Sequence, residues 1–415
     1  MSSFLQDAVI TESVLVGASL SDIQRLCKAR SRLLNSTERT VIWPKLAGLP
    51  DEVYGEVDEG WRTQPCHRDE DQVMLDVQRT QFLVRSGLQT KDNEKYREEL
   101  NDLIVRLLRE HPTLSYYQGL HDIAALILIV LKDRDEPEVT YKFFEMFSFC
   151  HLRDFMMPDL TMSTQMLNMV PECISLVDRQ LYDELSLESM KPFFCLSPII
   201  TLLTHDIKNF SSLCLIFDQV LACGSIGIVV YIYVALMINQ QDKYLEKIRL
   251  MEQEDMFSRE DLVHNALSKF LMDVSLDDVE LAIADSYKIL EKWPLEKLKS
   301  FKRLRKWSVM KTTSKVYVGD IRKLVQFRAE TDFDKLMKKQ MMPSPMIVKL
   351  LMNEKNHRLI KISLSVGIIS IVLSILLNKH HPQRYTALCQ TVSSWLVNTN
   401  HAGKLHSFLD GLGLP

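Results

Sequence analysis

The sequence predicts an all-α fold, and three observations favour this class. Glycine accounts for only 13 of 415 residues, below the roughly 7% of an average chain. Segments with apolar residues at helical spacing recur along the first 290 residues. No pair of neighbouring segments has the alternating pattern of a β-hairpin. With 46% hydrophobic and 25% charged residues, the chain has a globular composition and ample length for a large core.

The helices are expected in the following order. The first begins at Ser21, because Ser21 and Gln24 have the spacing of a capping box. The clearest amphipathic helix covers residues 95–110 and ends before Pro112. Its apolar face includes Leu103, Ile104 and Leu107, which should be buried. Further helices are expected at 120–131, 138–150, 193–203, 213–221, 226–238, 261–271 and 276–290.

Two apolar runs raise the question of a membrane span. Residues 226–238 are too few to cross a bilayer and are expected to form a buried core helix. Residues 362–377 are 16 uncharged residues, about 24 Å as a helix. They follow a basic region, since residues 295–361 carry 18 Lys and Arg against 6 Asp and Glu. This pattern favours a single transmembrane helix at 359–378 over a buried terminal helix.

The charge distribution also limits the partners. Residues 1–294 carry 29 Lys and Arg against 47 Asp and Glu, so a general nucleic-acid binder is not expected. The basic residues 296–358 are expected to form a tether before the span, either as a solvated linker or attracted to anionic lipid. The eight cysteines are scattered without a CxxC pair, which is typical of reduced cysteines in the cytosol.

The sequence lacks the common motifs of nucleotide, acyl-transfer and zinc chemistry. It contains no GxxxxGK[ST], GxGxxG, GxSxG or HExxH pattern. The adjacent pairs Cys66-His67 and Cys150-His151 do not have metal-ligand spacing. Neither a metal nor a cofactor is therefore expected.

Two polar clusters remain as candidates for chemistry. Asp76 and Arg79 are spaced three apart in a helical segment, so the carboxylate can restrain the guanidinium. The run YYQGLHDI, residues 116–123, leads from a turn into an apolar helix, which places Gln118 where its side chain can project. Taken singly, each cluster could be no more than a surface ion pair or a turn.

Together the two clusters resemble a known family. Val73-x-x-Asp76-x-x-Arg79 resembles the IxxDxxR motif, and Tyr116-x-Gln118-Gly119 the YxQG motif, of the TBC-domain GTPase-activating proteins for Rab GTPases. An Arg39…Trp43-Pro44 opening and the later Phe217-Asp218 are similar to further family motifs. The resemblance covers roughly residues 20–290. The runs 116–123 and 151–155 look most like a branch that has a C-terminal membrane anchor and acts at the endoplasmic reticulum.

The resemblance implies a function and a set of roles. The chain would accelerate GTP hydrolysis by a GTP-bound Rab of the early secretory pathway, without being a nucleotide hydrolase itself. Arg79 and Gln118 would act in trans on the bound GTP, with Asp76 orienting Arg79. The residues expected to support the site or to contact the Rab are Asp76, Tyr116, Tyr117, Gly119 and Asp122. No cofactor would be bound, because GTP and magnesium arrive on the partner.

The expected organisation follows from these assignments. An N-terminal arm (1–18) precedes a TBC domain (19–295), the tether, the transmembrane helix and a lumenal tail (379–415). The protein would be a single-pass protein of the endoplasmic reticulum membrane, or of the Golgi, with its catalytic domain in the cytosol and lipid contact through residues 359–378. The main alternative is a catalytically silent, membrane-anchored Rab-binding scaffold. A membrane-shaping or transport protein would need more than one span.

Overall fold

A computed structural model describes residues 22–24, 34–49, 58–80, 93–132, 136–158, 160–252, 258–305 and 308–311. Every regular element in these ranges is a helix, which confirms the all-α prediction for this part of the chain. The predicted helix after Ser21 lies mostly outside the described residues. The predicted N-terminal arm, transmembrane helix and lumenal tail lie wholly outside them.

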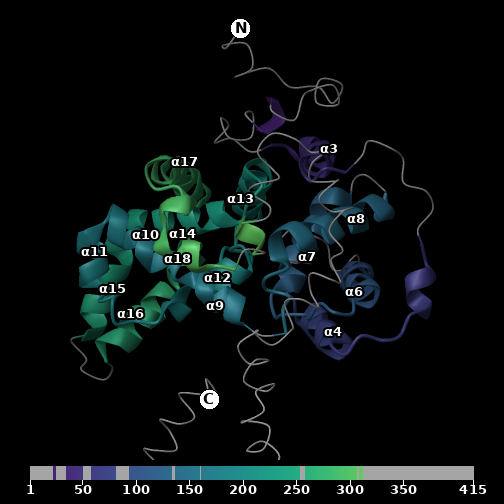
Figure 1. Ribbon diagram of the computed structural model, residues 1–415, viewed down its shortest axis with the longest axis horizontal. Coiled ribbons are helices and arrows are strands. Elements are labelled where there is room, and N and C mark those ends of the chain that lie inside the picture. The colour runs from purple at the N-terminus through teal and green to yellow at the C-terminus, as the bar shows by residue number, and fades with distance from the viewer. Residues whose placement is uncertain are drawn as a thin grey trace, which may run out of the picture. The chain divides into compact units, whose positions relative to one another are not determined.

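A first group of helices carries the two polar clusters and lies together in Figure 1. It consists of α3 (Ser36–Leu46), α4 (Glu70–Arg79), α6 (Asn93–Glu110), α7 (Leu120–Leu131) and α8 (Pro137–Phe147). The apolar helix α7 packs against all four of the others. As predicted, Leu103, Ile104 and Leu107 of α6 are buried.

A second group surrounds α14 (Gly227–Asn239), which is buried along almost its whole length. α14 packs against α10, α12, α13, α15 and α17. This explains its uninterrupted apolar sequence and confirms that residues 226–238 belong to the core. The other helices of the group are α9 (Thr161–Leu167), α10 (Met169–Val177), α11 (Arg179–Glu184), α12 (Leu196–Ile200), α15 (Gln241–Glu252), α16 (Arg259–Leu267), α17 (Leu276–Lys292) and α18 (Lys299–Arg303).

Short helical turns connect these elements. They are η1 (Gly60–Thr63), η3 (Ser148–Leu152), η4 (Pro192–Cys195), η5 (Phe270–Asp273) and η6 (Leu295–Lys297). The π-helical η3 continues α8 directly, as the prediction of a helix over 138–150 required. The predicted helix over 193–203 instead ends at Ile200, because Leu202 and Leu203 adopt positive φ angles of 50° and 69°.

The helix α13 (Phe210–Cys223) joins the two groups, since it packs against α3 as well as α14 and α17. A buried polar cluster fixes the contact with α3. The Arg39 guanidinium donates to both carboxylate oxygens of Asp218 at 2.8–3.3 Å, and the Trp43 indole donates to one of them at 2.7 Å. Asp218 is fully buried, and burial raises the pKa of its carboxyl against the opposing effect of Arg39. The motif residues at 39, 43 and 218 thus hold the domain together.

The folded part of the chain continues past residue 295, into the segment predicted to be a tether. Leu298, Phe301 and Leu304 are buried, and α18 packs against α9 and α10. The Glu172 carboxylate accepts hydrogen bonds from the backbone amides of Lys299 and Ser300 at 2.6 and 2.8 Å. Residues 312–358 of the predicted tether lie outside the described residues.

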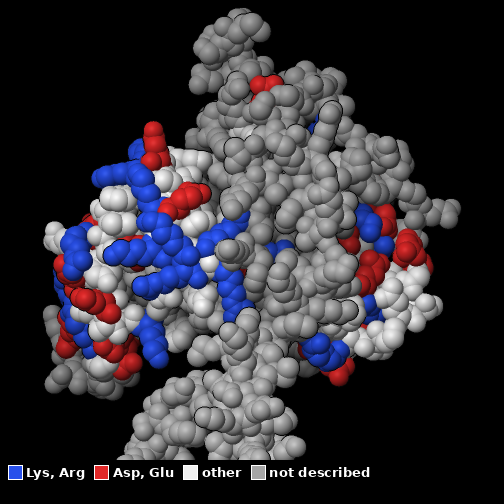
Figure 2. Space-filling view, viewed as in Figure 1, with Lys and Arg blue, Asp and Glu red and all other residues white. Residues whose placement is uncertain are grey.

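The basic side chains of this segment remain on the surface. Figure 2 shows Lys and Arg gathered over the part of the molecule where Figure 1 places α18. The exposed basic residues from the end of α17 to residue 305 are Lys292, Lys297, Lys299, Lys302, Arg303 and Arg305. Among the described residues, none of the helices combines the length and the apolar character that a membrane crossing requires.

Candidate functional site

The two polar clusters meet along one groove of about 650 Å³. The C-terminal end of α4 contributes Asp76 and Arg79, and the turn before α7 contributes residues 117–119. The opposite wall consists of α12 and the turn that follows it, with Leu160 nearby. On one wall, the groove brings together Arg79 and Gln118, which are about 40 positions apart in the sequence. The residues of the opposite wall follow Gln118 by about 80 positions.

Arg79 is the last residue of α4, and its side chain is 68% exposed. One terminal nitrogen of the guanidinium is ion-paired with Asp76, and Nε donates to the Leu75 carbonyl at 3.2 Å. A cation at this position also interacts favourably with the negative end of the helix dipole. The head group is thus held on one side and open to solvent on the other.

Asp76 is buried beneath Arg79, and three donors surround its carboxylate. Gln72 donates to Oδ1 at 3.0 Å, the Tyr116 hydroxyl donates to Oδ2 at 2.9 Å, and Arg79 donates to Oδ1. Burial alone would raise the pKa of Asp76, but these hydrogen bonds outweigh it, so the pKa lies below its usual value. Asp76 is therefore a carboxylate at neutral pH.

The turn 115–119 is fixed from both sides. The Tyr116 amide donates to Asp69 Oδ2 at 2.9 Å. The Tyr117 ring is buried, contacts Phe155 edge-on, and its hydroxyl donates to the Ile200 carbonyl at 3.0 Å. Burial raises the pKa values of both phenols. Tyr117 thus packs beneath the turn, while Tyr116 connects it to Asp76.

Gln118 is exposed at the top of this turn, and its side chain makes no hydrogen bond with another described residue. Gly119, which follows it, has φ 109°. A Cβ atom at Gly119 would lie 2.5 Å from Cγ2 of Thr201 on the opposite wall. Only glycine meets both requirements, the positive φ and the close approach.

Asp122, in the first turn of α7, connects the two walls of the groove. Its Oδ1 accepts from the Thr80 hydroxyl at 3.2 Å, and its Oδ2 lies 3.3 Å from His205 Nδ1. His121, beside it, is buried and lies 2.8 Å from the Tyr116 hydroxyl through Nδ1. Thr80, His121 and His205 are site residues that the sequence motifs did not indicate. His121 and Thr80 directly adjoin the two motifs, but nothing in the sequence indicates His205.

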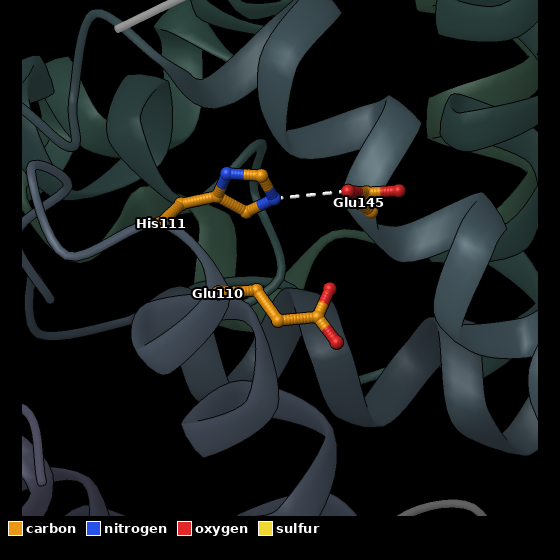
Figure 3. Close-up of side chains that lie close together, drawn as sticks. All are labelled: Glu110, His111 and Glu145. Atoms are coloured by element: carbon orange, nitrogen blue, oxygen red, sulfur yellow. Dashed lines mark hydrogen bonds and ion pairs between the residues drawn. The ribbon is translucent and has the colours of Figure 1, made fainter. Parts of the chain in front are cut away.

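A separate cluster lies away from the groove. Glu110, His111 and Glu145 bring their potential ligand atoms within 4.8 Å of one another (Figure 3). His111 Nε2 lies 2.9 Å from Glu145, and Glu110 accepts from Arg106 at 2.9 Å and from Tyr141 at 2.6 Å. These contacts already supply each carboxylate with a donor, so the arrangement is stable without a cation.

The chain is similar to a family of known proteins. The model of the Rab-GTPase-TBC domain family matches residues 36–245. TBC1 domain family member 20 of Bos taurus is 30% identical over 224 residues, which are 53% of this chain and 53% of that protein. GTPase-activating protein gyp10 of Schizosaccharomyces pombe is 27% identical over 265 residues, which are 64% and 68% of the two chains. The chain thus spans about half the length of the bovine relative.

Among solved structures, the crystal structure of the Chlamydomonas flagellar RabGAP TBC domain is similar with a TM-score of 0.46 and 11% identity. The alignment covers 64% of this chain and 83% of that one. All of the groove residues named above lie within the segment that the family model matches.

Proposed function

This chain belongs to the Rab-GTPase-TBC domain family, and from that premise we propose that it accelerates GTP hydrolysis by a Rab GTPase. The observation that carries the proposal is the placement of Arg79 and Gln118 along one groove. Both side chains are exposed, while the residues beneath them, Asp76 and Tyr117, are buried and hydrogen-bonded. Such a site can present two polar groups to a partner without rearranging its own framework.

Arg79 would act as an arginine finger. GTP hydrolysis develops charge on the transferred phosphoryl group, and a guanidinium supplied in trans accelerates the reaction by ~10³–10⁵. The planar guanidinium can donate to a phosphate oxygen while it keeps its bond to Asp76. The pair would therefore deliver the charge in a defined orientation.

Gln118 would orient the attacking water. Its amide offers both a donor and an acceptor, and neither is engaged by another described residue. Gly119 lets the adjacent backbone lie close to Thr201 on the opposite wall, and this contact would fix the position of Gln118 beside it. The GTP-bound Rab would bring the nucleotide and its magnesium ion, so the chain needs no cofactor of its own.

The surface around Arg79 suits a protein partner. Met74, Leu75 and Leu160 are about half exposed, at 47%, 49% and 51%. Large apolar side chains that flank an exposed arginine resemble the centre of a protein–protein interface. These three apolar side chains would supply affinity for the Rab, while Arg79 and Gln118 would supply catalysis.

A single-turnover hydrolysis assay over a panel of purified GTP-loaded Rabs tests the proposal. The wild-type chain should stimulate at least one Rab of the early secretory pathway, and Arg79→Lys should reduce that stimulation by roughly 10²-fold or more. Arg179→Lys is the matched control, because Arg179 is also exposed and paired with an aspartate in its own helix. Equal activity of the wild type and Arg79→Lys would contradict the assignment.

The alternative is a catalytically silent scaffold that binds the Rab without acting on it. It predicts binding to a GTP-bound Rab that Arg79→Ala leaves intact, together with no stimulation by the wild type. The charge and hydrogen bonds committed to holding Arg79 favour the catalytic proposal. Measuring binding and hydrolysis on the same samples separates the two.

We also propose that residues 359–378 anchor the chain in the endoplasmic reticulum membrane, with 379–415 lumenal and the folded helices cytosolic. The basic residues before the apolar run, and the exposed basic surface near α18, agree with the cytosolic orientation. An engineered glycosylation sequon near Gly411 should be modified, and arginines in place of Ile369 and Leu373 should release the protein from carbonate-washed membranes. Retention of that variant on membranes would argue against the anchor.

A further inference from the structure

A chain of polar contacts runs beneath the groove from Arg79 to His121. Arg79 is bonded to Asp76, Asp76 Oδ2 accepts from the Tyr116 hydroxyl at 2.9 Å, and the Tyr116 oxygen lies 2.8 Å from His121 Nδ1. His121 is 9% exposed and belongs to the first turn of α7. This series of polar contacts thus connects the exposed guanidinium of Arg79 on α4 to the buried imidazole of His121 on α7.

The available protons determine the direction of each bond. A phenol carries one proton, and the carboxylate of Asp76 can only accept. For both contacts to be hydrogen bonds at the same time, the hydroxyl of Tyr116 donates to Asp76 and its oxygen accepts from His121. This arrangement requires a proton on Nδ1 of His121.

We propose that His121 is a positioning residue of this site. It donates to the Tyr116 oxygen, so that the Tyr116 hydroxyl proton points to Asp76 Oδ2. This hydrogen bond holds the Asp76 carboxylate in the orientation in which Oδ1 restrains Arg79. The role rests on the proposed function of Arg79 as an arginine finger. In the other neutral tautomer, with the proton on Nε2, the phenol would turn its proton toward His121. Asp76 would then lose one of its three donors, and the restraint on Arg79 would weaken.

The surroundings of His121 decide which forms compete. Nε2 lies 3.4 Å from Asp122 Oδ1. Burial lowers the pKa of the imidazole, the carboxylates of Asp122 and Asp76 oppose that shift, and His205 and Arg79 add to it. The net shift of the pKa is downward, so His121 is neutral near pH 7. Its one ring proton therefore lies either on Nδ1 or on Nε2.

The first test reads the tautomer directly and needs no Rab. Full-length protein labelled with ¹⁵N in its histidine rings is examined by NMR near neutral pH, and the His121 signals are assigned by their loss in His121→Asn. The proposal requires the Nδ1–H tautomer, and its ring shifts should change in Tyr116→Phe. Observation of the Nε2–H tautomer would overturn it.

The second test reads catalysis with the Rab that is most strongly stimulated in the panel. His121→Leu removes the donor and should lower kcat about 10-fold with KM unchanged, as expected for the loss of one hydrogen bond near a charged group. His121→Asn should recover most of the rate, because its amide N–H can take the place of Nδ1–H. His264→Asn, at an exposed histidine of α16, is the control.

A double-mutant comparison separates positioning from general structural damage. In the Tyr116→Phe background the hydroxyl that connects His121 to Asp76 is already missing, so His121→Leu should have no further effect on kcat. Additive losses, or equal impairment in His121→Leu and His121→Asn, would overturn the proposal. If the wild type stimulates no Rab, the proposed function fails by itself, and the tautomer measurement still decides whether His121 holds Tyr116.

Discussion

Gly119→Ala offers a quantitative test of how the groove holds Gln118. Two separate costs follow from the structure. An alanine at φ 109° lies in a region that L-residues avoid, at a cost of ~1–2 kcal/mol. The new Cβ would also lie 2.5 Å from Cγ2 of Thr201, against ~3.5–4.0 Å for a favourable carbon contact.

The overlap should add ~1–3 kcal/mol, as for other overpacked sites, so the total expected loss of unfolding free energy is ~2–5 kcal/mol. Thr201→Ser separates the two costs. It removes Cγ2 but keeps the hydroxyl, which donates to the Ser197 carbonyl at 2.8 Å. In the Thr201→Ser background, Gly119→Ala should cost only the conformational part.

The assay is denaturant unfolding of the four proteins of this cycle, followed by tryptophan fluorescence, with Rab-stimulated hydrolysis measured on the same samples. Gly119→Ala should lower kcat as well as stability, because it displaces the adjacent Gln118, and Thr201→Ser should restore part of both. An unchanged unfolding midpoint in Gly119→Ala would refute the argument from φ. A full cost that persists in the double mutant would refute the argument from Thr201.

Three further predictions concern other parts of the domain. Leu107→Ala should destabilise by ~2–5 kcal/mol in denaturant unfolding, because Leu107 is fully buried. Leu75→Asp should raise KM for the Rab in steady-state hydrolysis while kcat changes little, because Leu75 is exposed beside Arg79. The stability difference between wild type and Asp76→Asn should be largest well above pH ~3.9, the ordinary value for Asp, and shrink as pH falls through the lower pKa of folded Asp76; a difference that grows on acidification would contradict that sign.

The sequence predicted best those helices whose surroundings are simple. α6 has one buried face, so its apolar residues follow helical spacing and give its position closely. α3 was missed because it is buried on nearly all sides, and several of its polar residues are enclosed too. Arg39 can be buried because Asp218, 179 positions away, accepts a hydrogen bond from it. The spacing of residues within one segment cannot predict a partner so distant in the sequence.

The end of α12 shows a related limit. Residues 193–203 are mostly apolar and give no signal of a stop, yet the helix ends at Ile200 and the backbone turns through Leu202 and Leu203 with positive φ. Both of these side chains are buried, so packing offsets the strain of the turn. This turn forms a wall of the groove and places Thr201 against Gly119, which makes it a determinant of the site that propensity alone could not predict.

The basic segment after residue 295 illustrates how composition can hide a pattern. Its many lysines and arginines favour a solvated tether, but Leu298, Phe301 and Leu304 recur every three residues and are buried, while the basic side chains between them are exposed. Spacing was therefore the stronger signal. The same holds for the site, where Asp76 and Arg79 were recognisable from a separation of three, whereas His121 and Thr201 gain their importance from contacts across the groove. A site assembled from distant segments is thus predictable in its exposed groups, which follow motifs, and much less so in the buried groups that position them.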